Sequence, residues 1–556
     1  MFNPLRSIRA ASIVLAGVLY VLAAIPVNAA PVELDSGSIE GEALATTDGV
    51  RVYRGIPFAA PPVRDLRWQP PQPVAKWDDV RPATQFSAAC PQGSVLAQMM
   101  GETMSELSED CLYLNVWTAA EDTAAELPVM VWIHGGGLTL GWGHQSGYDG
   151  THFAERGVIL VSINYRLGPL GYLAHPALSQ ESARGVSGNY GFLDQLAALQ
   201  WVQHNIAKFG GDPNNVTIFG ESAGGTSVNV LVASPLSKGL FHRAIAQSPW
   251  ITDTNFAMLN QALPTVASAE DLGVQWAQSI LDGKSSDDLR AMRAVSSEEI
   301  LTKTGDAYPV VTTVDGWFMP DLSENIFARG EQQDVSLIVG TNSDEGTIFL
   351  AFLPFNTLEA YESTMRTTYG VYADRILGLY PAADQSQLAA AKNQLITDTW
   401  FVRGASNMLE GMAKVSSEAF QYHFTRRSTA LAALGAHHGL EIGYAFNNLN
   451  PLQGGDTDKA LSEAMIQYWV QFAKSGDPNV DGLTQWPAYV PATNRYLELG
   501  EAITAGANLR QEAIHTLNAI HQAQFAVETG LPCIVLVAWR LRVQRAPDAV
   551  SGIRPN

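Results

Sequence analysis

The sequence predicts an α/β protein built on one large, mostly parallel sheet with helices on both faces. Short continuous apolar runs with β-branched residues recur along the chain, as expected for strands buried on both faces. Longer segments with helical spacing separate them, for example 189–209, where Leu193, Leu196, Trp201 and Ile206 repeat. Strand–helix alternation of this kind favours parallel strands joined by crossover helices. The candidate strands are 129–133, 158–164, 216–219, 243–247 and 335–340.

Two helical segments, 255–299 and 357–414, interrupt the alternation. The first is polar and shows no strand pattern, so both are expected to be helical insertions over the sheet edge or a functional site. We predict one domain over residues 31–530. Residues 531–556, an apolar run followed by arginines, are expected to form a C-terminal tail too short to span a membrane.

The first 30 residues have the pattern of a secretory signal peptide. Arg6 and Arg9 precede an apolar stretch up to Pro26, and small residues follow, with cleavage expected after Ala29 or Ala30. The alternative is an uncleaved membrane anchor, but the apolar run is shorter than the ~20 residues that a spanning helix needs. We therefore expect a secreted or periplasmic protein without stable membrane insertion.

The charge balance excludes one class of partner. The chain has 556 residues and a formal net charge of −21, so it repels phosphate backbones and is not expected to bind nucleic acid. An apolar content of 46% allows a large buried core. The oligomeric state is not indicated by the sequence.

A nucleophile motif follows the strand 216–219. Gly220-Glu221-Ser222-Ala223-Gly224 stands between this strand and a helical segment. In this context Gly-x-Ser-x-Gly forms a sharp turn that exposes the serine at the start of a helix, as in the α/β-hydrolase fold. The alternative is a purely structural turn. The strand directly before the motif favours Ser222 as a nucleophile.

An oxyanion-hole motif follows the strand 129–133. His134-Gly135-Gly136-Gly137 offers backbone N–H groups that glycine allows to approach a substrate carbonyl, with the N–H of Ala223 as the partner donor. A flexible turn or a phosphate-binding loop would be the alternative, but no Gly-Lys-Ser/Thr pattern follows. His134 is expected to support the loop rather than act as a base.

The acid and the base should follow the serine in chain order. Asp344 and Glu345 both stand just after the strand 335–340, and the residues alone do not separate them. Among the later histidines, His437 and His438 lie in a glycine-flanked loop that suits a base. The other three are expected in a strand core (His423) or on a helix as surface or packing residues (His515 and His521).

Several motifs, in order, are similar to those of the type-B carboxylesterase family, which includes cholinesterases and bacterial nitrobenzyl-type esterases. The similarity extends from about residue 34 to about residue 500 and implies the α/β-hydrolase fold. The segments that carry it are Glu109-Asp110-Cys111-Leu112-Tyr113-Leu114-Asn115-Val116, Asn164-Tyr165-Arg166-Leu167-Gly168, Asn189-Tyr190-Gly191-Phe192-Leu193-Asp194-Gln195, Phe209-Gly210-Gly211-Asp212-Pro213 before the Ser222 motif, and Gly476-Asp477-Pro478-Asn479.

The resemblance implies which of the open candidates act. It selects Glu345 from the Asp-Glu-Gly element as the acid, and His438 from the His-Gly-x-Glu element as the base. It assigns the oxyanion donors to Gly136, Gly137 and Ala223. The family's disulfide falls on Cys90 and Cys111, which leaves Cys533 unpaired.

The chain departs from the family pattern at two places. Leu138 follows the glycines where the family has an aromatic residue, and Pro249-Trp250 follows Gln247-Ser248 where the family has glycine. Both positions are expected near the substrate pocket, so the family's substrate preference cannot be transferred.

Together, the motifs and the resemblance predict a serine carboxylesterase. It is expected to hydrolyse small-molecule esters through a Ser222–Glu345–His438 triad and a covalent acyl-enzyme, without a metal or cofactor. Two alternatives share the scaffold: a non-catalytic adhesion or binding homologue, and a hydrolase of amides or carbamates. The intact triad residues argue against the first.

Overall fold

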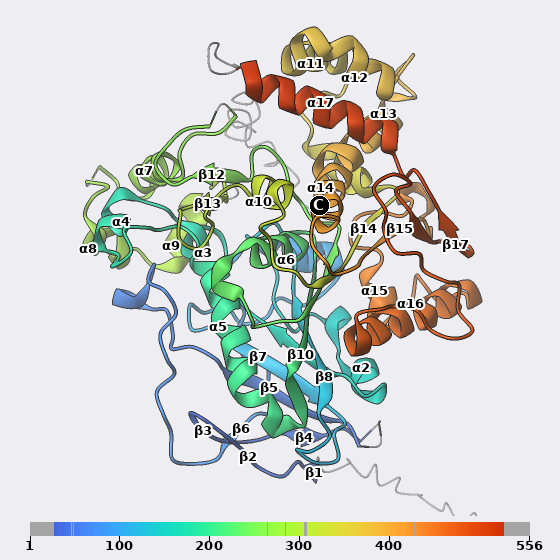
Figure 1. Cartoon of the computed structure of the whole chain (residues 1–556). Coiled ribbons are helices and arrows are strands. Elements are labelled where there is room, and N and C mark those ends of the chain that lie inside the picture. Colours follow the sequence, from blue (N-terminus) through green and yellow to red (C-terminus); the bar gives the residue numbers. More distant parts are fainter. Residues whose placement is uncertain are drawn as a thin grey trace, which may run out of the picture.

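The computed structural model is centred on one 12-stranded mixed sheet (Figure 1). It describes residues 27–527 apart from 46, 48, 264, 284, 305–307 and 428–429. Residues 1–26 of the expected signal segment, and the tail 531–556 with Cys533, lie outside the described residues.

Seven neighbouring strands at the centre of the sheet are parallel, which confirms the predicted fold class. All five predicted strands are among them. In spatial order they are β9 (Ile159–Ile163), β8 (Leu127–Ile133), β10 (Gly211–Glu221), β11 (Arg243–Gln247), β14 (Ser336–Asn342), β15 (Ala419–Phe424) and β16 (Tyr496–Leu499).

The two sides of the sheet end in antiparallel strands, so the sheet is mixed rather than parallel throughout. These strands are β1 (Val27–Asn28), β4 (Glu42–Ala43), β5 (Arg51–Pro57) and β7 (Tyr113–Thr118) on one side, and β17 (Ile503–Gly506) on the other. Two small sheets lie apart from it, formed by β2 (Val32–Leu34), β3 (Gly37–Glu40) and β6 (Arg81–Pro82), and by β12 (Phe256–Met258) and β13 (Thr312–Val314).

Helices cover both faces of the sheet because successive side chains of a strand point to opposite faces. On β8, Val129 and Val131 pack into the core beneath α5 (Tyr190–Asn205) and α6 (Ala223–Ala233). Met130 and Trp132 pack into the opposite core, which contains the apolar face of α16 (Asp456–Ser475). Figure 1 shows α5 and α6 on one side of the strands and α16 on the other.

The predicted helical insertions are confirmed, with one correction. The segment 255–299 contains α7 (Ala269–Ile280), α8 (Leu289–Ala294) and the start of α9 (Ser297–Thr304), but it also contains the strand β12. A strand of three residues is too short to show an alternating pattern, so the sequence did not indicate it.

The second insertion forms a helical layer at one end of the sheet together with the C-terminal helix α17 (Gln511–Val527), as Figure 1 shows. Ile514, Leu517 and Ile520 of α17 share an apolar cluster with this insertion. None of the helices in the described residues combines the length and apolar composition that a membrane span requires. The helices of the insertion are α11 (Leu358–Tyr369), α12 (Ala373–Leu379), α13 (Leu388–Ile396) and α14 (Arg403–Met412).

The remaining helices are short and connect these layers. They are α1 (Val95–Met100), α2 (Thr151–Glu155), α3 (Gly168–Tyr172), α4 (Pro176–Glu181), α10 (Ser323–Arg329) and α15 (Ile442–Ala445).

Candidate active site

Ser222 occupies a strained turn between the end of β10 and the start of α6. Its φ of 58° and ψ of −119° are rarely adopted by residues other than glycine. A Cβ on Gly220 or Gly224 would lie 2.5 Å or 2.0 Å from the carbonyl oxygen of Ile133. The two glycines of the motif are therefore needed for the turn to pack against β8, and the strand–turn–helix context predicted for Ser222 is confirmed.

The glycine loop after β8 passes beside Ser222. A Cβ on Gly135 would lie 3.1 Å from the Cβ of Ser222, so the loop backbone approaches the serine closely. Gly136 and Gly137 have φ values of 102° and 63°, a region in which other residues are strained. Ala223, the first residue of α6, contributes one of the N–H groups that have no partner within their helix.

His134 supports this loop, as the sequence predicts. Its side chain is fully buried, and its Nδ1 lies 2.8 Å from the carbonyl oxygen of Gly135. The ring stacks on Tyr165 at 4.3 Å, and the Tyr165 hydroxyl donates to the carbonyl oxygen of His134. Burial lowers the pKa of His134 to about 4, so the ring stays neutral.

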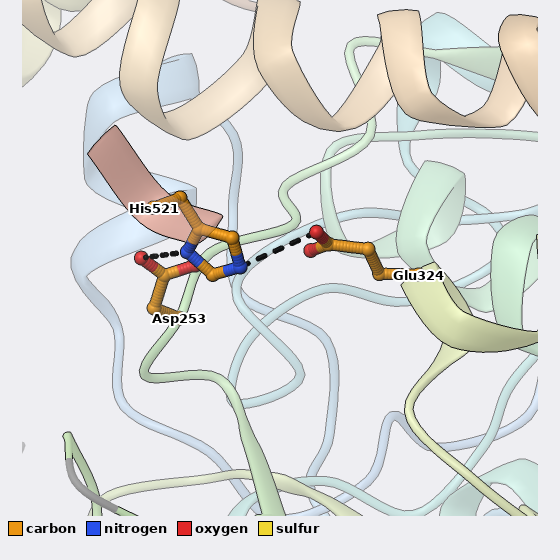
Figure 2. Close-up of side chains that lie close together, drawn as sticks. All are labelled: Asp253, Glu324 and His521. Carbon is orange, nitrogen blue, oxygen red and sulfur yellow. Dashed lines mark hydrogen bonds and ion pairs between the residues drawn. The ribbon is translucent and has the colours of Figure 1, made fainter. Parts of the chain in front are cut away.

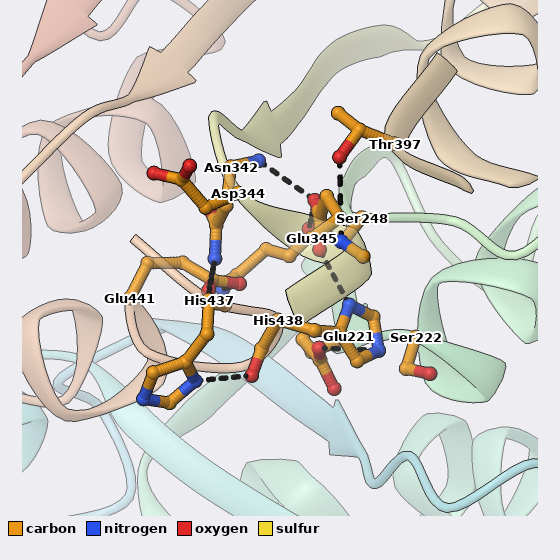
Figure 3. Close-up of polar contacts among 12 residues, drawn as sticks. Glu221, Ser222, Ser248, Asn342, Asp344, Glu345, Thr397, His437, His438 and Glu441 are labelled. Atoms are coloured by element: carbon orange, nitrogen blue, oxygen red, sulfur yellow. Dashed lines mark hydrogen bonds and ion pairs between the residues drawn. The ribbon is translucent and has the colours of Figure 1, made fainter. Parts of the chain in front are cut away.

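His438 lies beside Ser222 and binds Glu345 through its other edge (Figure 3). Its Nδ1 donates to Oε2 of Glu345 at 2.6 Å. Its Nε2 is buried and makes no hydrogen bond within the described part of the chain, although Oε1 of Glu221 is 3.2 Å away. This is the arrangement of a base whose Nε2 can take up a proton from Ser222.

Glu345 is completely buried at the start of the short 3-10 helix η5 (Glu345–Phe352), directly after β14. Its two oxygens have different partners. Oε2 accepts from His438, whereas Oε1 accepts from the Ser248 hydroxyl at 2.6 Å and from the Asn342 backbone N–H at 2.7 Å. The carboxylate is thus fixed in one orientation.

Asp344 faces away from His438 and supports the loop that carries it. Its Oδ2 accepts from the Ala436 backbone N–H at 3.0 Å, and its Oδ1 accepts from the Asn393 amide at 3.1 Å. The choice of Glu345 over Asp344 as the partner of the histidine therefore agrees with the geometry. His437 also points elsewhere, with its Nδ1 2.9 Å from the carbonyl oxygen of His438.

Three buried carboxylates, Glu221, Glu345 and Glu441, surround this one histidine. Burial raises the pKa of Glu221 to about 8 and raises the pKa of Glu441. Burial lowers the pKa of His438, but the charges of Glu221 and Glu345 outweigh it and raise the pKa to about 9. The acidic groups around the ring therefore stabilise the imidazolium form of His438.

Several residues of the site carried no assigned role in the sequence. Ser248 and Asn342 hold Glu345, while Glu441 accepts from the Asn342 amide at 2.6 Å and from the Gln247 amide at 3.2 Å. Glu221 and Glu441 stand within the two motifs that contain Ser222 and His438, and this position is the sequence feature that could have indicated their place in the site.

Aromatic rings close one side of the site. The rings of Phe401 and Phe349 lie 4.5 Å and 5.2 Å from the His438 ring. Phe401 belongs to η7 (Thr397–Val402), a short π-helix between α13 and α14. Such π-helical turns are rare and are frequent at functional sites.

A disulfide joins Cys90 to Cys111, the pairing that the family resemblance implies. It closes a loop with a sequence separation of 21 residues. Gln92, just after Cys90, accepts from the backbone N–H of Gly141, which follows the oxyanion loop. The disulfide-closed loop is therefore attached to the loop beside Ser222.

Comparison with known proteins agrees with this geometry. The model of the "Carboxylesterase family" matches residues 28–517. Fumonisin B1 esterase from Sphingopyxis macrogoltabida is 38% identical over 495 residues, which cover 85% of this chain and 86% of that protein. Para-nitrobenzyl esterase from Bacillus subtilis (strain 168) is 35% identical over 490 residues, covering 84% and 94%.

Solved structures give the same result. A structure of PNB esterase superposes with a TM-score of 0.76 at 33% sequence identity and covers 88% of this chain and 99% of its own. The fold, the extent of the match and the relatives at this level of identity all point to one family. The chain belongs to the carboxylesterase family of α/β-hydrolases and is a carboxylic ester hydrolase.

Proposed function

We propose that Ser222, His438 and Glu345 form the catalytic triad of this esterase and that the reaction proceeds through an acyl-enzyme. The observation that carries the proposal is the His438 imidazole, which donates from Nδ1 to the buried Glu345 and presents an unbonded Nε2 beside Ser222 (Figure 3). Nδ1 holds a proton in this tautomer, so Nε2 is the atom that accepts one.

In the first step Nε2 of His438 takes the hydroxyl proton of Ser222 while Oγ attacks the ester carbonyl. The oxyanion then lies against the N–H groups of Gly136, Gly137 and Ala223, of which the loss of one typically costs about 3 kcal/mol of transition-state stabilisation. His438 returns the proton to the departing alcohol. In the second step His438 activates a water molecule, which releases the acid from Ser222.

The surroundings of the site favour esters with an apolar group. Phe349 and Phe401 offer an apolar surface next to His438 that can contact such a group.

Ser222→Ala tests the nucleophile. The variant should lose turnover of p-nitrophenyl acetate and labelling by a fluorophosphonate probe, while its thermal unfolding stays close to that of the wild type. Amide analogues assayed beside the esters separate an esterase from an amidase. Labelling of the variant at another serine would show that the nucleophile lies elsewhere.

We also propose that the protein is exported, which rests on Arg6, Arg9 and the apolar stretch before Ala30. N-terminal sequencing of the protein recovered from its native host should give Ala30 or Pro31. Recovery of an intact Met1 from a cytoplasmic fraction would refute export.

A further inference from the structure

Two tryptophans extend the aromatic surface of the site outward from His438. Trp400, on the π-helix η7, lies 5.4 Å from Phe349 and 6.4 Å from Trp250, measured between ring centroids. Trp250 follows Ser248, and its carbonyl oxygen accepts from the hydroxyl of Thr226 in the first turn after Ser222. Both tryptophans are partly exposed. The two rings form a wall, here called the tryptophan wall, that Phe349 connects to His438.

The two segments of the tryptophan wall are far apart in sequence and are joined just behind the rings. The Ile251 backbone N–H donates to the carbonyl oxygen of Trp400 at 3.2 Å. Asp253, three positions after Trp250, pairs with Arg403, three positions after Trp400. The Arg403 side chain is only 6% exposed and that of Asp253 is 34% exposed, so solvent screens this ion pair in part.

His521, from the C-terminal helix α17, completes the ion pair (Figure 2). Its Nδ1 lies 3.1 Å from Oδ2 of Asp253, and its Nε2 lies 3.3 Å from Oε1 of Glu324 on α10. Glu324 is also 3.7 Å from Arg403. Two carboxylates thus face two basic side chains, and the cluster is neutral only while the imidazole of His521 is protonated.

The geometry suits a proton better than a metal ion. One ligand atom from each of Asp253, Glu324 and His521 lies within 4.8 Å of the others, a spacing that a divalent cation tolerates. However, the two carboxylates contact the two different nitrogens of the ring, and Arg403 already neutralises one of them. Burial lowers the pKa of His521, but its hydrogen bonds to Asp253 and Glu324 outweigh it and raise the pKa to about 9.

The other ionisable groups close to this cluster do not supply the positive charge by which His521 balances the two carboxylates. Burial raises the pKa of Tyr369, the last residue of α11, to about 12, and the charge of Asp253 adds to this, so Tyr369 stays neutral. A second contact, from Arg510 to the buried Asp398 of η7, also ties α17 to the π-helix that carries Trp400. The C-terminal helix therefore holds both segments of the tryptophan wall.

We propose that His521 is a positioning residue that fixes the tryptophan wall through Asp253 and Arg403, and so sets which bulky apolar esters the site accepts. The proposal rests on the proposed function of Ser222 and His438. Without the imidazolium, the two partly exposed carboxylates of Asp253 and Glu324 share one buried Arg403, and their mutual repulsion is no longer balanced. The cluster then takes up water, and Trp250 and Trp400 separate.

The variants are His521→Ala and His521→Gln, with His515→Ala as the matched control because His515 is an exposed residue of the same helix. The readout is the ratio of kcat/KM for p-nitrophenyl benzoate to that for p-nitrophenyl acetate. An aromatic pair contributes about 0.5–1.5 kcal/mol, so loss of the wall should lower this ratio by up to about tenfold, mainly through KM for the benzoate. His515→Ala should keep the wild-type ratio.

Two further measurements separate positioning from general stability. In a Trp250→Ala background, His521→Ala should change the ratio no further. For the wild type, the ratio should fall as the pH rises through about 9, where the His521 charge is lost, whereas His521→Gln should show no such step. Both esters share the ionisation of His438, so that ionisation cancels in the ratio. His521→Gln, which keeps hydrogen-bonding groups, remains informative if His521→Ala does not fold.

An unchanged ratio in both His521 variants would overturn the proposal, and so would a change that persists in the Trp250→Ala background. A ratio lowered by EDTA in the wild type would also overturn it, in favour of a metal at Asp253, Glu324 and His521. Failure of the proposed triad would be seen differently, as acetate hydrolysis that survives in Ser222→Ala.

Discussion

Glu345→Gln should nearly abolish turnover, because the structure dictates how the new amide must lie. Oε1 accepts from both the Ser248 hydroxyl and the Asn342 backbone N–H, so the position of Oε1 must remain an acceptor. The amide nitrogen therefore replaces Oε2 and points its hydrogens at Nδ1 of His438, 2.6 Å away in the wild type. Nδ1 must then be the acceptor, and the imidazole proton moves to Nε2.

A protonated Nε2 cannot accept the proton of Ser222. Fixing a triad histidine in the wrong tautomer costs about 10⁴-fold in kcat, which corresponds to about 5.4 kcal/mol of transition-state stabilisation. The assay is kcat for p-nitrophenyl acetate, and circular dichroism and thermal unfolding show whether the variant is folded.

Asp344→Asn is the matched control, since it changes an adjacent carboxylate with the same chemistry. The amide can still accept from the Ala436 N–H, and it loses only part of the contacts that Oδ1 and Oδ2 make. We expect a loss of about 1–2 kcal/mol of stability and a change in kcat of less than about tenfold. A dead Asp344→Asn beside an active Glu345→Gln would refute the assignment of the acid.

Three other predictions concern charge and stability. Glu221→Gln removes a carboxylate 3.2 Å from Nε2 of His438, so the raised pKa of His438 should fall. Because the base must be neutral to act, the acid limb of the kcat/KM–pH profile should then move about 1–2 pH units lower. An acid limb at the wild-type pH would contradict this. The double variant Cys90→Ser/Cys111→Ser should lower the free energy of unfolding in urea by about 3 kcal/mol, and the wild type in reducing agent should match it. Asp194→Asn leaves the buried Arg166 without its charge partner, 2.6 Å away, and should cost about 3–5 kcal/mol; a loss below about 1 kcal/mol would show that water reaches Arg166.

The sequence was most informative where function is carried by local motifs. The five predicted strands and the turn at Ser222 depend on neighbouring residues, so their patterns could be read directly. The loop with His437 and His438 was also evident, but the choice of His438 and Glu345 required the resemblance to a family. The reason is that these two residues are 93 positions apart and meet only in the folded chain.

The contacts that no local pattern encodes were missed. Ser248 binds Glu345 across 97 positions, and Gln247 binds Glu441 across 194. His521 lies on a helix and is partly buried, as expected of a surface or packing residue, but its ionic partners were not indicated, because Asp253 and Glu324 come from segments about 200 or more positions earlier. The π-helix that contains Phe401 was not predicted either, because no local sequence pattern distinguishes it from the α-helices on both sides of it.

The backbone at Ser222 makes a non-glycine residue at this position costly to the folded state. A non-glycine residue held at a φ of 58° stores on the order of 1–3 kcal/mol, which the contacts around the turn must offset. Selection for stability alone would place glycine at this position, since glycine adopts such angles without a penalty. If the proposed role of its hydroxyl were no longer selected, replacing Ser222 with glycine would therefore recover stability, whereas replacing it with alanine, which keeps the Cβ, would not.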